Sequence, residues 1–155
     1  MAKPIPDGYR TVTPYLVFED ASEAIEFYKT AFGAKERMRM EAPDGKIGHA
    51  EIEIGDSVVM LSDAFPQSTT TPPSELGGTT AGVFLYVEDA DAVVQRAVDA
   101  GATVTVEVAD QFWGDRFGSL KDPFGHSWSV ATHVEDLTPD EIAERAKEAM
   151  AAMSS

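Results

Sequence analysis

The feature that most constrains the fold is a plan of one strand, one helix and three strands that the chain follows twice. The first copy spans residues 9–62 and the second spans residues 81–133. Each helix opens with Glu-Asp-Ala and closes with Gly-Ala, at Gly33-Ala34 and again at Gly101-Ala102. Because these signals recur in the same order and in near-constant register, they indicate an internal duplication.

Local patterns define the elements of the first copy. Residues 9–18 are rich in β-branched and aromatic side chains and predict a strand, with Pro14 at an edge or bulge position. Apolar residues over 21–32 recur at helical spacing, and Asp20 or Ser22 can cap this helix. Alternation of polar and apolar residues predicts further strands at residues 35–40, 47–54 and 57–62.

The second copy repeats these patterns and ends in a distinctive hairpin, W-G-D-R-F-G-S-L-K-D-P-F-G-H-S-W. The turn of this hairpin is Asp122-Pro123-Phe124-Gly125, because Pro presets one φ angle and Gly tolerates positive φ. Gly101 ends the helix that precedes it. The expected strands are residues 82–87, 103–108, 116–121 and 127–132.

The repeated plan predicts an α+β fold of two βαβββ modules in one domain, residues 1–133. In each module a helix covers one face of the strands, so the other face stays open. We expect the two modules to form a curved eight-stranded mixed sheet with the helices outside and a concave cleft inside. A Pro-, Gly- and Ser/Thr-rich linker loop joins the modules at residues 63–80, and residues 134–155 form an extension with an amphipathic helix at 138–153.

Composition excludes several classes of function. The net charge is −15, and Lys and Arg are not clustered, so binding to nucleic acid is not expected. The chain has no apolar run of about 18 residues, so it is not expected to enter a membrane. It contains no cysteine, which excludes disulfides and thiolate metal sites. No export signal is recognisable at the N-terminus, and a cytoplasmic location is therefore the expectation.

The paired modules, the helix run A-I-E-F-Y-K-T-A-F-G-A and the D-P-F-G hairpin together resemble the vicinal oxygen chelate superfamily. This superfamily includes glyoxalases, bleomycin-resistance binding proteins and extradiol dioxygenases, and the resemblance covers residues 10–133. Among its members, the chain looks most like the small single-domain bacterial proteins. The resemblance also implies a homodimer, in which modules can be exchanged between chains.

The resemblance marks four positions where the metal enzymes of the superfamily place His or Glu ligands. In this sequence they fall on Thr13, on Met60 (or Val59 with a one-residue shift), on Gly82 and on Ser129. None of these side chains is an imidazole or a carboxylate, which divalent cations require. No cofactor is therefore predicted at the superfamily's positions, although a divalent metal held elsewhere is possible.

The histidines are the remaining candidates for chemistry. His49 begins an alternating strand and shares one strand face with Glu51 and Glu53, so the row can serve proton transfer or an unconventional metal. The alternative is a solvent-facing polar row. His126 is expected to cap its turn or to lie at the surface, and His133 to lie at the cleft mouth or against the C-terminal helix.

Aromatic and polar residues are expected to line the cleft. Tyr15 and Phe84 lie two residues beyond Thr13 and Gly82 and should face the same side. Trp113 can form a wall for a planar ligand, while Trp128 can belong to the wall or to the core. Arg116 suits recognition of a carboxylate or phosphate, or else an ion pair with Asp115 or Asp122. The expected ligand-contacting residues are Thr13, Tyr15, Met60, Gly82, Phe84, Trp113, Arg116 and Ser129.

These observations favour a small-molecule-binding protein that sequesters a hydrophobic or cationic ligand in a metal-free aromatic cleft. The alternative is a metal-dependent or metal-free lyase, isomerase or dioxygenase-like enzyme that uses His49 with Glu51 or Glu53. A third possibility is a structural or regulatory partner protein, in which the 63–80 loop and the C-terminal helix carry the function.

Overall fold

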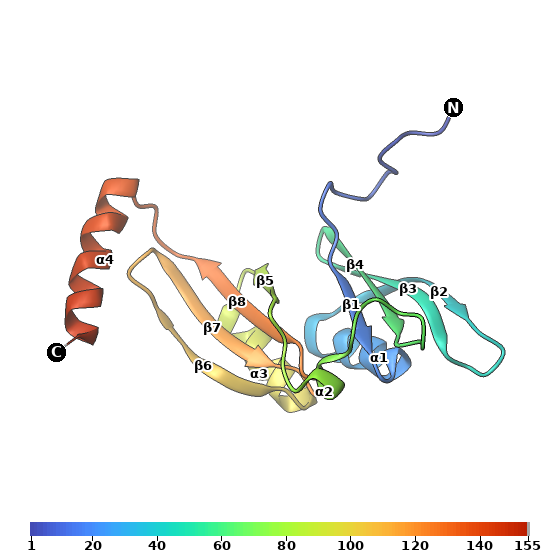
Figure 1. Ribbon diagram of the computed structural model, residues 1–155. Coiled ribbons are helices and arrows are strands. Elements are labelled where there is room, and N and C mark those ends of the chain that lie inside the picture. The colour runs from blue at the N-terminus through green and yellow to red at the C-terminus, as the bar shows by residue number, and fades with distance from the viewer. Residues whose placement is uncertain (155) are drawn as a thin grey trace.

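The computed structural model describes residues 1–154 and contains two βαβββ modules joined by a linker (Figure 1). The repeated plan and the α+β class are therefore confirmed. Module one consists of β1 (Tyr15–Phe18), α1 (Ala21–Phe32), β2 (Lys35–Glu41), β3 (Ile47–Ile54) and β4 (Ser57–Asp63).

Module two repeats the same order of elements. After the linker, which contains the short helix α2 (Pro73–Leu76), a second strand and helix begin the repeat. Its elements are β5 (Gly82–Tyr86), α3 (Ala90–Ala100), β6 (Thr103–Asp110), β7 (Asp115–Lys121) and β8 (Ser127–His133).

The eight strands are divided between two mixed sheets of four. The strand orders are β1-β4-β3-β2 and β5-β8-β7-β6. The pairs β1–β4 and β5–β8 are parallel, and all the other neighbouring strands are antiparallel. The sheets therefore have matching topology, and β1 and β5 each form one edge of their sheet. The eight strands therefore do not form the single continuous sheet that was expected but two separate sheets of four.

The predicted helix signals act as expected in both copies. Asp20 and Asp89 accept hydrogen bonds from backbone N–H groups in the first turns of α1 and α3, at 3.0 Å in each case. Gly33 and Gly101 end the two helices with positive φ angles, 66° and 123°, which favour glycine. The two module helices are therefore defined at both ends by local sequence.

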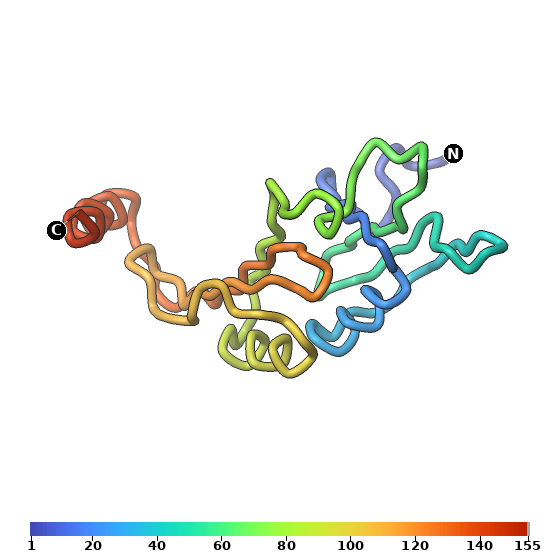
Figure 2. Tube along the Cα trace, turned by 60° about the horizontal axis from the view of Figure 1, so that its bottom comes forward, coloured from blue at the N-terminus to red at the C-terminus, as the bar shows by residue number. Residues whose placement is uncertain are grey.

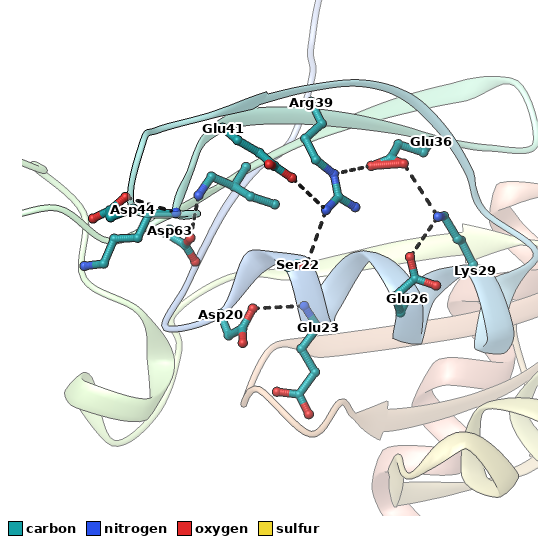
Figure 3. Close-up of polar contacts among 12 residues, drawn as sticks. Asp20, Ser22, Glu23, Glu26, Lys29, Glu36, Arg39, Glu41, Asp44 and Asp63 are labelled. Atoms are coloured by element: carbon teal, nitrogen blue, oxygen red, sulfur yellow. Dashed lines mark hydrogen bonds and ion pairs between the residues drawn. The ribbon is translucent and has the colours of Figure 1, made fainter.

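Polar contacts also tie α1 to β2 on the outer side of module one (Figure 3). Arg39 on β2 binds Glu36 at 2.6 Å and reaches Ser22 of α1 at 3.3 Å, and Lys29 of α1 lies 3.6 Å from Glu36. In the same module, buried Asp63 accepts hydrogen bonds from the backbone N–H groups of Ala21 and Ile47. This carboxylate connects β4 with the first residues of α1 and β3.

The two modules pack through their helices, which lie side by side below the sheets (Figure 2). Arg96 of α3 donates to the carbonyl oxygens of Thr30 and Lys29, at 2.5 and 3.4 Å, near the end of α1. The aromatic core crosses the same boundary, because Trp128 of β8 packs against Tyr28 and Phe32 of α1. Trp128 is fully buried and thus belongs to the core.

The D-P-F-G turn of module two is also part of this boundary. Asp122 accepts the Tyr28 hydroxyl at 2.5 Å and the Trp128 indole N–H at 2.9 Å. His126 is buried, contrary to the expected surface role, and its Nε2 lies 3.0 Å from the Val17 carbonyl oxygen. The ring of Phe124 packs against module one as well. The turn that identified the hairpin therefore joins the two modules.

The C-terminal helix and the start of the first strand differ in how well the sequence predicted them. Helix α4 (Pro139–Met153) begins as expected, with Thr138 and Glu141 forming a capping box, and it stands beyond β6 and β7 (Figure 1). The strand expected from residue 9 begins only at Tyr15. Pro14 has no backbone N–H to donate, although its carbonyl oxygen still accepts a hydrogen bond from Met60 N–H at 2.9 Å. Within residues 1–154, every helix is too short or too polar to span a bilayer.

Candidate functional site

Each sheet has one face packed against the module helices and one open face. Because side chains alternate along a strand, the residues opposite the helices can be read from the pairing register. In module one, Tyr15 and Glu51 both lie opposite Met60 across neighbouring strands. We call the open surface formed by Tyr15, His49, Glu51 and Met60 the polar face.

In module two, the corresponding surface is aromatic. Phe84 lies opposite Ser129, and Phe117 and Tyr86 both lie opposite Ala131. We call the surface formed by Phe84, Tyr86, Trp113 and Phe117 the aromatic face.

A chain of hydrogen bonds runs through the polar face. His49 Nε2 lies 2.9 Å from Glu51 Oε2, and His49 Nδ1 lies 3.0 Å from the Tyr15 hydroxyl. The hydroxyl of Tyr9, which precedes β1, donates to the other oxygen of Glu51, and Arg37 lies over the Tyr9 ring. The structure therefore brings together two predicted residues, His49 and Glu51, and adds two tyrosines that the sequence did not connect with them.

The Glu51 carboxylate is the buried centre of this group. It is 5% exposed, and burial by itself would raise its pKa. Hydrogen bonds from Tyr9 and His49 outweigh that effect, so the pKa of Glu51 is lowered and the group is ionised at neutral pH. The hydrogen bond to Glu51 raises the pKa of Tyr9. Glu53, the third candidate, lies further along β3 opposite Lys35 and Val58.

The aromatic face is built from rings on β5, on β7 and on the segment before β7. The Phe84 ring centroid lies 5.1 Å from that of Tyr86 and 5.7 Å from that of Phe117, and Trp113 lies 5.6 Å from Phe117. Phe84 is 48% exposed and Tyr86 is 65% exposed, so these rings present a broad apolar surface. The expected aromatic wall is thus larger than Phe84 and Trp113 alone.

A buried carboxylate also anchors the aromatic face. Asp115 is 3% exposed and accepts hydrogen bonds from Tyr86, Trp113 and His133, at 2.9, 3.0 and 2.9 Å. Burial would raise its pKa, but these bonds outweigh that effect and lower it. The hydrogen bond to Asp115, together with one to Asp136, raises the pKa of His133.

Sequence reasoning missed Asp115 as a site residue and considered it only as a partner for Arg116. One signal was present in the sequence, because Asp115 lies two residues from Trp113 and from Phe117 and shares their strand face. Arg116 lies on the opposite face of β7 from Asp115 and Phe117. It binds Asp91 of α3 at 2.5 Å and Asp110 at 3.1 Å. Its ion pairs are therefore made with neither of the two partners expected.

A cavity of about 870 Å³ lies between the two modules. Module one contributes Thr13 and the turn between β3 and β4, and module two contributes Phe84, Tyr86 and the start of α3. The aromatic face thus reaches the wall of this cavity. The charged residues that line it are Arg10, Asp56, Glu88 and Asp89.

These charged residues make the cavity electronegative. Arg10 Nη2 lies 3.7 Å from Asp56 Oδ2, so the charge of this base is balanced by one acid. Glu88 and Asp89 add negative charge on the side of module two. A cavity lined by one sign of charge attracts ligands of the opposite sign.

The four positions marked by the superfamily's metal enzymes do not form a metal site here. Thr13 and Met60 line one depression together with residues of the N-terminal segment, whereas Gly82 lines another. Ser129 Oγ lies 3.1 Å from Ser119 Oγ across β7 and β8. Their donor set lacks imidazole and carboxylate, so these residues do not fit a divalent cation. In residues 1–154, no group of three or more His, Asp and Glu side chains is arranged to hold a metal ion.

Comparison with known sequences gives a consistent family assignment. Residues 11–130 match the profile of the Glyoxalase/Bleomycin resistance protein/Dioxygenase superfamily. The Mycobacterium tuberculosis protein Rv0887c is 47% identical over 134 residues, which cover 84% of this chain and 79% of that protein. The Arabidopsis thaliana protein At5g48480 is 35% identical over 131 residues, covering 79% of this chain and 77% of that protein.

Solved structures show the same architecture. TioX from Micromonospora sp. ML1 has a TM-score of 0.64 at 27% identity and covers 81% of this chain and 99% of its own. The fosfomycin resistance protein FosX from Listeria monocytogenes has a TM-score of 0.60 at 12% identity, covers 86% of this chain and 97% of its own, and shows likeness of fold alone. Sequence and structure thus agree that this chain belongs to the Glyoxalase/Bleomycin resistance protein/Dioxygenase superfamily.

Proposed function

We propose that this protein binds a small planar cationic molecule between its modules, with the aromatic face as the main contact surface. The observation that carries the proposal is the combination of exposed rings with an electronegative cavity. Phe84 and Tyr86 line both the aromatic face and the cavity of about 870 Å³. Aromatic faces attract cations, and planar ligands stack on rings of this kind.

Asp115 also supports binding of a planar ligand, because it fixes the positions of two aromatic rings. Its carboxylate fixes the Tyr86 hydroxyl and the Trp113 indole N–H, so both aromatic planes are held before a ligand arrives. Preorganised contact groups reduce the entropy that binding would otherwise cost. The name of the superfamily includes bleomycin resistance proteins, which agrees with a binding role of this type.

Tryptophan fluorescence tests the proposal directly, because the two tryptophans report on different places. Trp113 lies at the aromatic face and Trp128 is buried in the core. Titration with proflavine, a planar cation, or with a bleomycin-type glycopeptide should quench Trp113. The planar anion anilinonaphthalene sulfonate serves as the charge control and should bind more weakly.

Substitution of one ring locates the site. Phe84→Ala should weaken proflavine binding by about tenfold or more, as loss of a central aromatic contact does. Phe65→Ala is the matched control, because Phe65 lies in the linker and contacts Lys46 instead. The proposal fails if neither cation quenches the fluorescence, or if Phe84→Ala and Phe65→Ala bind proflavine equally well.

The polar face supports a second candidate function, an enzyme that uses His49 and Glu51 for acid–base chemistry. The supporting observation is the 2.9 Å hydrogen bond between these residues, with Glu51 ionised. Elemental analysis of the purified protein and of His49→Ala separates the metal-dependent form of this idea from the metal-free form. A stoichiometric metal that disappears in the variant would favour a metal enzyme and contradict a metal-free cleft.

A further inference from the structure

The hydrogen bonds of the polar face fix where the protons lie. Ionised Glu51 can only accept, so the Tyr9 hydroxyl donates to one of its oxygens and His49 Nε2–H donates to the other. In a neutral imidazole the remaining nitrogen, Nδ1, is then an acceptor. In that tautomer the Tyr15 hydroxyl donates its proton to His49 Nδ1, across 3.0 Å.

This arrangement has the order hydroxyl, imidazole, carboxylate, which is the order used to activate hydroxyl groups in many enzymes. The carboxylate end is closed, since Glu51 is 5% exposed and Tyr9 covers its second oxygen. The hydroxyl end is open, since Tyr15 is 48% exposed on an edge strand. A small molecule can therefore reach the relay through Tyr15, whereas both nitrogens of His49 are already engaged.

We infer that Tyr15 is the reactive end of a proton relay on the polar face and accepts a proton from a weakly acidic N–H or O–H group of a small molecule. In this step the ligand proton moves to Tyr15 Oη while the proton of Tyr15 moves to His49 Nδ1. The products are the deprotonated ligand and a His49 imidazolium, whose charge the Glu51 carboxylate balances. The inference rests on the second candidate function and names the group that would contact the substrate, with His49 and Glu51 as positioning residues.

Tyr86 provides a control within the same chain. It is also an exposed tyrosine on an edge strand, 65% exposed on β5, but its hydroxyl donates to the Asp115 carboxylate at 2.9 Å. That hydrogen bond raises the pKa of Tyr86. Tyr86 is thus the more accessible phenol of the two, yet it has no imidazole to receive its proton.

Labelling with an aryl sulfonyl fluoride measures the difference in reactivity between Tyr15 and Tyr86, and it requires no knowledge of the substrate. The tyrosine oxygen forms a bond to sulfur, fluoride leaves, and the phenol proton passes to its hydrogen-bond acceptor. Peptide mass spectrometry of the intact folded chain gives a labelling rate for each tyrosine. We expect Tyr15 to react at least about tenfold faster than Tyr86, which is a low value for general-base assistance.

Variants of the relay sharpen the test. His49→Gln keeps a polar side chain but has no basic nitrogen, and it should lower the Tyr15 rate to that of Tyr86. His49→Phe should give the same result, and Glu51→Gln an intermediate rate. Near-ultraviolet circular dichroism and an unchanged Tyr86 rate would show that each variant is folded.

Two results would overturn the relay: equal labelling of Tyr15 and Tyr86 in the wild type, or a fast Tyr15 rate that persists in folded His49→Gln. Labelling needs no turnover of a natural substrate. Failure to find any catalysed reaction would therefore count against the second candidate function, whereas slow labelling of Tyr15 would count against the relay itself.

Discussion

Modules one and two share their elements, their strand order and their helix ends, but their open faces carry different side chains. The helix side is repeated closely, from the caps at Asp20 and Asp89 to the glycines that end α1 and α3. The open side is tyrosine, histidine and glutamate in module one and mostly aromatic in module two. The residues that the two modules share are thus the ones that define the helices and strands, whereas the side chains on the open faces differ.

Both open faces nevertheless have one buried carboxylate that accepts hydrogen bonds from a tyrosine and a histidine. In module one this is Glu51, with Tyr9 and His49, and in module two it is Asp115, which binds Tyr86 and His133. The carboxylates lie on different strands, β3 and β7, so the likeness is one of chemistry rather than of position. In each face the carboxylate thus fixes the orientation of a tyrosine and a histidine side chain.

The largest expected effect concerns a second pair of buried carboxylates, those of Asp63 and Asp122. Asp122→Ala should lower the free energy of unfolding by about 4 kcal/mol, because four donors, three of them in buried contacts, lose their acceptor. Asp63→Ala removes the acceptor of only two backbone N–H groups and should cost roughly half as much. The four donors to Asp122 are Tyr28 Oη, Trp128 Nε1, Phe124 N and His126 N.

Urea denaturation of the two variants measures this difference. Equal losses would show that Asp122 does no more for the contact between modules than Asp63 does within one module. Asp122→Asn keeps the shape of the side chain and should fall between the wild type and Asp122→Ala.

The ends of the two helices give the next effect. Gly101→Ala should cost about 2 kcal/mol and Gly33→Ala about 1 kcal/mol, because only the φ of Gly33 lies near the left-handed region that other residues can enter. Gly101, at 123°, lies well outside it. Thermal unfolding followed by circular dichroism would detect the difference, and a reversed order would contradict this reading of the backbone.

The helix caps should behave alike. Asp20→Ala and Asp89→Ala each remove one side-chain hydrogen bond to the first turn, and each should cost about 1 kcal/mol. Chemical denaturation of both variants is the measurement. If one variant loses more than twice as much free energy of unfolding as the other, the two caps do not contribute equally despite their equal geometry.

The smallest effect is the pH dependence of the Asp115–His133 pair. The pKa of His133 is raised in the folded state, so its contribution to stability is fully present below the ordinary histidine value, about 6.5, and is lost as pH rises through the raised value. The melting temperature of the wild type should exceed that of His133→Gln most at about pH 6, with the gap narrowing toward alkaline pH. A constant gap would mean that His133 acts through packing.

Local signals made most of the fold predictable. Strand alternation, the Asp caps and the Gly stops act over a few residues, so they can be read without knowing the tertiary contacts. The limits of the strands were less certain, as residues 9–14 show. Their composition favours a strand, but Pro14 cannot donate to the ladder and Tyr9 instead bonds to Glu51 on a strand far along the chain.

The candidate site was predictable only in part. The row of His49 and Glu51 followed from alternation along one strand, and the structure joins these residues. The partners Tyr9 and Tyr15 come from before and within another strand, and no spacing in the sequence connects them with His49. Arg116 was expected at a ligand surface, but strand alternation places it with Asp91 and Asp110.

The sequence by itself determined the duplicated βαβββ plan, the places where each helix begins and ends, and the lack of ligand-type side chains at the superfamily's metal positions. These properties depend on residue types and short spacings. Only the tertiary structure decided that the D-P-F-G turn joins the modules, that Asp115 anchors the aromatic face, and that Tyr15 reaches His49. The physical reason is that hydrogen bonds between strands and modules depend on which side chains pack together, and sequence distance does not encode that packing.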